Sequence, residues 1–307
     1  MLPASRSMSA VVGTVVPMPP VLTSPLVSTQ WLADHLGADD MVVVDTTVLP
    51  VAGVDGTPTG RFVTGREGHR AEHVPGAVFA DLIRDFSDAD AHLPFTRPDR
   101  LRFEDAVGAL GISNDTTVVV YDDSLGEWAC RLWWLFRAFG YDDVAVLDGG
   151  AGVWRDERRP VERGHVEPEP TLFEARERPE LWVDKAFVER VVAGDETAAL
   201  VCASPSAEFA GTEGRRPRRG HIPGSLSAPA STLVDGDHQF RPDAQLKSIF
   251  APVADAARVV VYCGGGITAS ADAFALTLIG ERNVALYDGS LNEWSADPGA
   301  PLESLAA

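Results

Sequence analysis

The 307-residue sequence lacks any hydrophobic run that approaches the roughly 18 residues of a membrane-spanning helix. It is also poor in positive charge, because 26 Lys and Arg residues stand against 45 Asp and Glu residues, for a formal net charge of −19. This deficit argues against binding to nucleic acid or to an anionic membrane surface, since both require cationic side chains. A small anionic ligand would therefore need a local positive site within a negative field.

Cysteine is also scarce. Cys130, Cys202 and Cys263 are far apart in the sequence, so they predict neither a disulfide framework nor a paired-cysteine metal site. This usage favours a reducing, cytoplasmic environment. Cys202 ends an apolar segment without neighbouring glycines, and Cys130 lies in a helical stretch close to two tryptophans. We therefore expect Cys202 and Cys130 to be buried residues of the core.

Cys263 has a different setting. It follows the apolar run 259–262 and precedes three glycines and a helix-compatible stretch. Free backbone amides and the positive end of a helix dipole lower the pKa of a thiol at such a turn, which makes the thiolate available as a nucleophile. A buried structural cysteine is the alternative, and the three glycines argue against it. The candidate anion-binding amides belong to Gly264, Gly265, Gly266, Ile267, Thr268 and Ala269.

A phosphatase loop is one interpretation of a cysteine in this setting. Cysteine phosphatases place an arginine at the sixth position after the nucleophile, where it binds the phosphate in a two-pronged manner. Here that position is Ala269, and no arginine occurs between Cys263 and Arg282. Phosphate-ester hydrolysis is therefore disfavoured.

The sequence contains an internal repeat. Segments 121–154 and 262–294 both begin with Tyr and end with Trp, and they differ in length by one residue. Asp122 holds in the first copy the position that Cys263 holds in the second. Because a carboxylate cannot replace the thiolate, we predict that the first copy is a structural, non-catalytic half. The copies also share a His-x-Pro-Gly turn, at 73–76 and 221–224.

Each copy alternates apolar segments with helical ones. Continuous apolar runs such as 118–120 and 259–261 are typical of strands that are buried on both faces. The pattern predicts an α/β fold with two tandem domains, each a mainly parallel sheet flanked by helices. Ligands of such sheets bind at the carboxyl ends of the strands, where Cys263 lies. The predicted boundaries are 1–22 for a disordered extension (favoured over a signal peptide), 23–160 for the N-terminal domain, 161–179 for a linker and 180–307 for the C-terminal domain.

Taken together, the repeat, the two turns and the Tyr-Cys-Gly-Gly-Gly-Ile-Thr-Ala segment at 262–269 resemble the two-domain rhodanese sulfurtransferases. That family includes thiosulfate sulfurtransferase and 3-mercaptopyruvate sulfurtransferase. The resemblance implies an inactive N-terminal domain, a catalytic C-terminal domain and a site in the cleft between them. It also implies that Cys263 takes a sulfur atom from a small anionic donor as a persulfide. A thiol or cyanide then accepts that sulfur, and no metal or organic cofactor is needed.

The sequence departs from the family pattern at the donor site. The loop after Cys263 is uncharged, which is similar to the 3-mercaptopyruvate type, but Gly265 stands where that type has serine. A Ser/His/Asp proton relay is then incomplete. His73 is its candidate histidine and a possible donor-binding residue, unless it is only a turn residue that is hydrogen-bonded to backbone. Ser204 and Glu208 replace two family cations, and a carboxylate there is expected to repel an anionic donor. The candidate replacements, unless they form only a solvated loop, are Arg215, Arg216, Arg218 and Arg219.

The missing family cations keep a second class of function open. The alternative is a non-catalytic or regulatory rhodanese module that carries a persulfide or binds a partner through the cleft. The sulfurtransferase is the leading hypothesis. Loading of Cys263 with sulfur from thiosulfate or 3-mercaptopyruvate separates the two.

Overall fold

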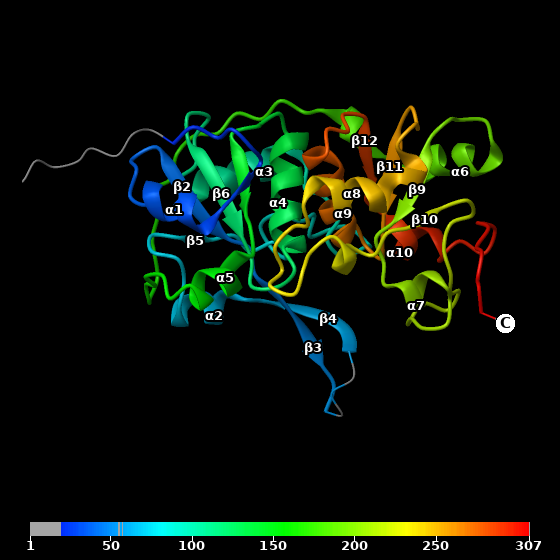
Figure 1. Cartoon of the computed structure of the whole chain (residues 1–307), viewed down its shortest axis with the longest axis horizontal. Coiled ribbons are helices and arrows are strands. Elements are labelled where there is room, and N and C mark those ends of the chain that lie inside the picture. The colour runs from blue at the N-terminus through cyan, green and yellow to red at the C-terminus, as the bar shows by residue number, and fades with distance from the viewer. Residues whose placement is uncertain (1–19, 55, 57, 307) are drawn as a thin grey trace, which may run out of the picture.

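The computed structural model describes residues 20–54, 56 and 58–306 of the chain. Two α/β halves lie side by side, and each contains one five-stranded sheet flanked by helices (Figure 1). The pairs of neighbouring strands within both sheets are parallel. The predicted fold class is therefore confirmed. The extension predicted for residues 1–22 falls, up to residue 19, outside the described residues.

The N-terminal half builds its sheet in the order β5-β2-β6-β7-β1. Its central strand β6 is buried along its whole length, as its run of valines predicts. The helices and strands of this half are β1 (Leu26–Val27), α1 (Thr29–His35), β2 (Met41–Asp45), β3 (Val48–Ala52), β4 (Pro58–Thr64), α2 (Arg66–Ala71), β5 (Val78–Phe79), α3 (Arg100–Ala109), β6 (Thr117–Tyr121), α4 (Glu127–Ala138), β7 (Val144–Leu147) and α5 (Gly150–Asp156).

The C-terminal half repeats this topology with the strand order β10-β9-β11-β12-β8. Short 3₁₀ turns at 179–181, 230–232 and 251–253 join some of its elements. The helices and strands are β8 (Trp182–Val183), α6 (Lys185–Ala193), β9 (Ala199–Cys202), α7 (Ser206–Phe209), β10 (Leu226–Ser227), α8 (Asp243–Phe250), β11 (Val259–Tyr262), α9 (Thr268–Leu278), β12 (Val284–Tyr287) and α10 (Ser290–Trp294).

The first helix of each half starts at the residue that the sequence indicates. The side chain of Ser28 accepts a hydrogen bond from the amide of Trp31, and the side chain of Asp184 accepts one from the amide of Phe187. Each cap satisfies a backbone donor that the helix itself leaves unpaired. The same local signal therefore fixes the same element in both copies.

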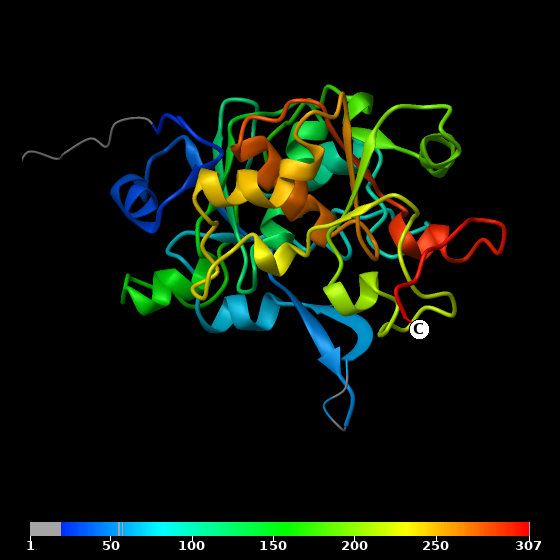
Figure 2. The same ribbon diagram turned by 45° about the vertical axis from the view of Figure 1, so that its right-hand side comes forward.

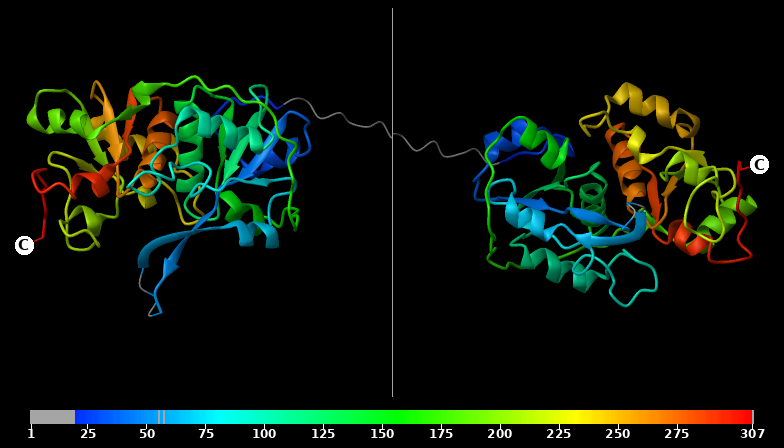
Figure 3. Two further views of the ribbon diagram at one scale, coloured as in Figure 1. Left: turned by 180° about the vertical axis from the view of Figure 1, so that it is seen from behind. Right: turned by 90° about the horizontal axis from the view of Figure 1, so that it is seen from below.

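The two halves share a hydrophobic core in which α4 packs against α9. The ring of Trp133 meets that of Phe274 edge to face at a centroid distance of 4.7 Å, and Cys130 is fully buried in the same core. Figures 2 and 3 show these two central helices between the sheets from further directions. Because the interface is apolar, the halves form one continuous packed unit around it.

One feature of the N-terminal half has no counterpart in the repeat. Strands β3 and β4 form an antiparallel hairpin that projects from the body of the molecule (Figure 1). The ring of Phe62 on β4 lies 5.5 Å from that of Trp128 and 5.6 Å from that of Phe95, which anchors the base of the hairpin beside α4. The sequence analysis did not identify this hairpin.

Within the described part of the chain, no helix has the length and apolar character needed to cross a lipid bilayer.

Candidate active site

The cysteine loop lies at the carboxyl end of β11, as the sequence predicts. The Cys263 side chain is only 3% exposed, and the amide of Gly266 donates a hydrogen bond to its sulfur over 3.2 Å. The backbone of Cys263 is held from both sides, because its amide donates to Ser290 Oγ at 3.1 Å and its carbonyl accepts from the amide of Leu291 at 3.0 Å. The loop thus presents a fixed sulfur with an amide directed at it.

Glycine at position 266 is required by this geometry. Its φ of +81° lies in the left-handed region, and a Cβ there would come within 2.9 Å of Asp288 Oδ1 and 3.3 Å of Arg131 Nη1. The loop turns sharply at this residue, and α9 begins two residues later at Thr268. The turn therefore places the start of α9, with its unpaired amides, close to the cysteine.

Arg131 on α4 reaches across from the N-terminal half and braces the loop. Its guanidinium donates to the carbonyls of Gly266 at 3.4 Å and Phe95 at 2.7 Å, and it pairs with Asp288 at 2.8 Å. The side chain is only 2% exposed. The sequence analysis missed this residue, although an arginine among the tryptophans of an apolar helix was an available signal, because a buried arginine needs partners.

Cys263 borders a cavity of about 980 Å³ between the two halves. The C-terminal half contributes the cysteine loop and Ser204, while the N-terminal half contributes the aromatic rings of Phe62, Phe95 and Trp128. The sulfur is buried and borders this cavity, which is partly open to solvent. This arrangement suits a nucleophile that must meet a small ligand entering from solvent.

The four candidate arginines separate into two pairs. Arg215 and Arg216 line the cavity, and Arg216 forms an ion pair with Glu208 at 3.1 Å. A Cβ on Gly264 would lie only 3.0 Å from Arg216 Nη2, so this guanidinium sits directly beside the cysteine loop. Glu208 therefore holds a cation at the site, although its sequence position suggested a repulsive charge.

The other two arginines lie elsewhere. Arg218 donates to the backbone carbonyls of Asp297 and Ala300, and it does not line the cavity. Arg219 is exposed and also lies outside the cavity wall. The structure thus brings half of the candidate arginine cluster to Cys263.

His73 is not brought to the cysteine. Its side chain is 4% exposed, its Nδ1 lies 2.7 Å from the carbonyl oxygen of His69, and its ring stacks on the ring of His69. It is absent from the wall of the cavity. The interpretation of His73 as a donor-binding residue is corrected accordingly: the histidine belongs to the buried turn that leads into β5.

The other two cysteines are buried, as expected. Burial raises the pKa of the Cys202 thiol to about 11 and that of the Cys130 thiol well above its ordinary value. Both therefore stay protonated near neutral pH. Cys202 packs in the cluster on the opposite side of the C-terminal sheet from Cys263. Neither competes with Cys263 as a nucleophile.

The first copy shows what the same turn does with a carboxylate. Asp122 is 1% exposed, and its Oδ1 accepts hydrogen bonds from the amides of Ser124 at 2.8 Å and Gly126 at 3.1 Å. Its Oδ2 accepts from the amides of Trp128 at 3.0 Å and Ala129 at 2.9 Å. Burial raises the pKa of Asp122, and the hydrogen bonds from these amides act in the opposite direction, because they favour the ionised carboxylate.

A second carboxyl group lies next to Asp122 and faces the cavity. Glu127, the first residue of α4, accepts hydrogen bonds from Ser124 Oγ at 3.1 Å and from the amide of Leu125 at 3.0 Å. Burial, together with the nearby charge of Asp122, raises the pKa of Glu127 from 4.5 to about 7. Asp122 receives more amide hydrogen bonds, so Glu127 is the member of the pair that holds a proton more readily.

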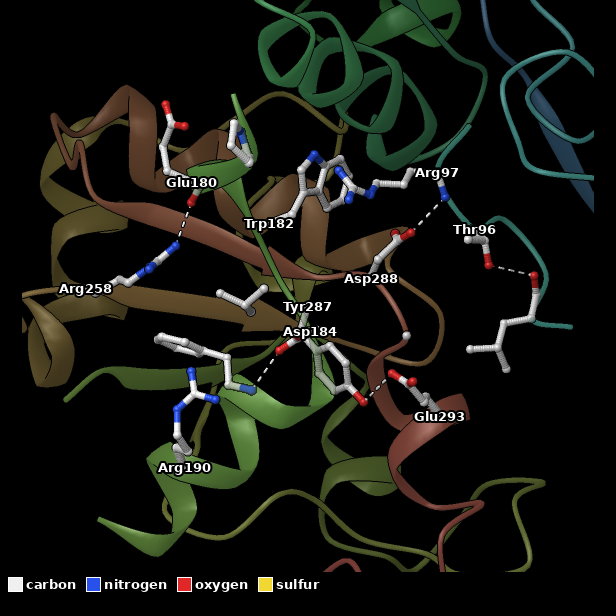
Figure 4. Close-up of a pocket in the computed structure, with 15 residues that line it drawn as sticks. Thr96, Arg97, Glu180, Trp182, Asp184, Arg190, Arg258, Tyr287, Asp288 and Glu293 are labelled. Atoms are coloured by element: carbon white, nitrogen blue, oxygen red, sulfur yellow. Dashed lines mark hydrogen bonds between the residues drawn. The ribbon is translucent and has the colours of Figure 1, made fainter. Parts of the chain in front are cut away.

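A smaller pocket of about 550 Å³ lies on the other side of Asp288 (Figure 4). The amide of Arg97 donates to Asp288 Oδ2 at 2.8 Å, and the Arg97 guanidinium lies 5.1 Å from the ring centre of Trp182. Cys263 does not line this pocket. The contacts of Arg97 in this pocket join the loop before α3 to the C-terminal sheet. They also help to hold Asp288 behind the cysteine loop.

We expect Glu127→Gln to become more stable than the unchanged protein as pH rises. Protonated Glu127 contributes stability that is fully present below about pH 4.5 and is lost as pH passes about 7, because the folded chain has the higher pKa. One unit of pKa difference corresponds to about 1.4 kcal/mol, so the relative free energy of unfolding should change by about 1–3 kcal/mol between pH 5 and pH 8. Urea denaturation at several pH values measures it.

The matched control for this prediction is Asp123→Asn, which removes an exposed carboxylate nearby. Equal pH dependence for the two variants would contradict the assignment of the proton to Glu127.

The comparisons with known proteins agree with this geometry. A family model described as a rhodanese-like domain matches residues 28–157 and again 167–297. The chain is 33% identical to the 3-mercaptopyruvate sulfurtransferase of Escherichia coli strain K12, over 92% of this chain and 99% of that protein. It is 34% identical to the thiosulfate sulfurtransferase of Gallus gallus, over 88% of this chain and 92% of that protein.

Solved structures give the same result. The crystal structure of SseA, a 3-mercaptopyruvate sulfotransferase of Escherichia coli, superimposes with a TM-score of 0.76 at 32% identity, covering 87% of this chain and 99% of that one. A structure of EanB with ergothioneine reaches a TM-score of 0.79 at 23% identity, covering 92% of this chain and 70% of that one, which shows the fold alone. The chain belongs to the rhodanese family.

Its tandem architecture and its full-length relatives define it more closely as a two-domain sulfurtransferase.

Proposed function

We propose that the protein transfers a sulfane sulfur through a persulfide on Cys263, from a small anionic donor to a thiol or cyanide, with no metal or organic cofactor. The observation that carries the proposal is the amide of Gly266 directed at the Cys263 sulfur on the wall of a cavity between the two halves. The thiolate attacks the sulfur atom that the donor gives up, and the rest of the donor leaves with the electron pair of the bond that breaks. An acceptor then attacks the outer sulfur of the persulfide and regenerates the thiolate.

The amides of Gly264 to Ala269 are the proposed cradle for the terminal sulfur. The four amides that surround Asp122 in the first copy support this role, because the two turns occupy equivalent places in the two sheets. An amide-lined turn stabilises negative charge without placing a full positive charge beside the thiolate. The cradle therefore suits the Cys263 thiolate and a persulfide that carries negative charge, as it does after transfer from thiosulfate.

Arg216 is the proposed anchor for the anionic end of the donor, with Arg215 beside it on the cavity wall. Glu208 offsets part of the charge of Arg216, and the cysteine loop itself carries no ionisable side chain besides Cys263. Such a site favours a donor with one negative charge over one with two. The preferred donor is then 3-mercaptopyruvate rather than thiosulfate.

We expect kcat/KM to be higher for 3-mercaptopyruvate than for thiosulfate, with cyanide as the common acceptor. Glu208→Gln should shift the ratio toward thiosulfate by about tenfold, because it leaves the charge of Arg216 without its partner. Thiocyanate formation measures both rates. A ratio that favours thiosulfate in the unchanged protein would overturn the donor assignment.

Replacing the nucleophile should abolish turnover. Cys263→Ser is expected to lower kcat by at least about 10³-fold, because the hydroxyl does not ionise at neutral pH. The unchanged protein should gain the mass of one sulfur atom on incubation with donor, and the variant should not, as read by intact mass spectrometry. If neither donor loads Cys263 above the variant, the non-catalytic module is the better description.

Arg216→Gln should raise the KM for the donor by about 10-fold or more and change kcat less, since a lost charge-assisted contact weakens binding in the ground and transition states alike. Arg219→Gln is the matched control, because Arg219 comes from the same loop and lies outside the cavity. Equal effects of the two substitutions on KM would show that Arg216 acts only through the overall electrostatic field of the protein and does not contact the donor.

A further inference from the structure

We propose that Glu127, on the N-terminal half, is the general acid and base of the transfer reaction: it protonates the departing carbon of a thiol donor and later takes the proton back from the acceptor. The inference rests on the proposed function of Cys263. It assigns a chemical role to the half that has lost its own nucleophile.

The position of Glu127 follows from the geometry of α4. Residues four apart on a helix lie on the same face, which puts Glu127 one turn before Arg131. Arg131 contacts the carbonyl of Gly266 in the cysteine loop, so this face of α4 is directed at the loop. Glu127 and Cys263 border the same cavity from opposite halves.

The remaining carboxylates of the cavity wall do not suit this role. Glu208 is held in its ion pair with Arg216, and Asp88 is exposed to solvent. Glu127 is partly buried and lines the cavity, and the bonds from Ser124 and Leu125 both go to its Oε2.

The titratable groups around Glu127 come from both halves. Asp122 and Cys130 belong to the same copy, and both interact electrostatically with Glu127. From the C-terminal half, His238 lies 2.8 Å from the carbonyl of the neighbouring Ser124, and Asp272 of α9 interacts with Cys130. Burial, and after it the negative charge of Asp122, raises the pKa of Glu127 to about 7, which suits proton transfer in both directions near neutral pH.

The chemistry of a thiol donor requires such a group. When the Cys263 thiolate attacks the sulfur of 3-mercaptopyruvate, an S–S bond forms and the C–S bond breaks, and its electron pair leaves as the enolate of pyruvate. The proton of the donor thiol stays on the outer sulfur. Glu127 gives its proton to the enolate carbon, which yields pyruvate and a Glu127 carboxylate.

The second half of the cycle restores the proton. An acceptor thiol transfers its proton to the Glu127 carboxylate, and its sulfur attacks the outer sulfur of the persulfide. The S–S bond to Cys263 breaks, and the electron pair returns to the thiolate. With cyanide as acceptor, the proton released from the outer sulfur returns to Glu127 instead.

Thiosulfate provides the internal control for this proposal. Its attack by Cys263 releases sulfite as a dianion and leaves an unprotonated persulfide, so no proton is transferred in either half. A general acid is therefore needed for one donor and not for the other, while the fold, the nucleophile and the cradle are common to both.

The test is Glu127→Gln assayed with both donors and with cyanide as acceptor. We expect kcat with 3-mercaptopyruvate to fall by about 10²-fold and thiosulfate turnover to change by less than about twofold. The control Asp123→Asn removes an exposed carboxylate that does not line the cavity and should change neither rate. Equal effects of Glu127→Gln on both donors, including no effect on either, would overturn the proposal.

The pH profile is an independent readout that does not depend on thiosulfate. In the unchanged protein, kcat with 3-mercaptopyruvate should decline above about pH 7 as Glu127 loses its proton, and this decline should be absent from Glu127→Gln. Glu127→Asp should retain both the decline and part of the rate. An identical profile in the Gln variant would contradict the role, whereas failure of Cys263 to load from any donor would instead contradict the proposed function itself.

Discussion

The site depends on one constraint: backbone amides point at a single acidic group at the carboxyl end of a buried parallel strand. In the first copy, four amides donate to the carboxyl group of Asp122, and at the equivalent turn of the second copy the amide of Gly266 donates to the sulfur of Cys263. An amide-lined turn needs a helix start close behind the strand, and the left-handed φ of Gly266 provides the required bend. The turn is thus a general anion site, and the residue placed in it decides whether it is structural or reactive.

The proposed donor site keeps a positive charge although the residues at the positions of the family cations are Ser204 and Glu208. Glu208 stands where the family resemblance predicts a cation, which by itself predicts repulsion of an anionic donor. In the folded chain Glu208 instead binds Arg216 and holds the guanidinium beside Gly264. The charge therefore reaches the cysteine loop from a different segment, and the carboxylate reduces its strength at the same time. A site built this way differs in net charge from one with two unpaired arginines, and that difference bears directly on donor choice.

The sequence was sufficient for the features that depend on local signals. The valine runs of β6 and β11, the caps at Ser28 and Asp184, and the glycines after Cys263 each act within a few residues, so the α/β halves and the reactive loop could be predicted. Arg131, Glu127 and the hairpin at β3 and β4 could not, because their roles depend on packing between halves. The contact of Arg131 with Gly266 joins residues 135 positions apart. The choice between a site residue and a turn residue for His73 stayed open for a related reason: its motif identifies a turn but does not say which face of the sheet that turn reaches.

The loss of the nucleophile from the N-terminal half does not make that half dispensable. Asp122 fills the first anion site permanently, which fixes the start of α4 and with it the direction of the helix face that carries Arg131. Arg131 then supports the carbonyl of Gly266 and the carboxylate of Asp288, the two groups that confine the cysteine loop from behind. A bound group that leaves the turn, as a substrate anion must, would hold the first residues of α4 less firmly than the Asp122 side chain does. The first copy therefore contributes to the site through the aspartate that stands in place of a cysteine, because a permanently occupied turn is a better structural support than one that must open and close.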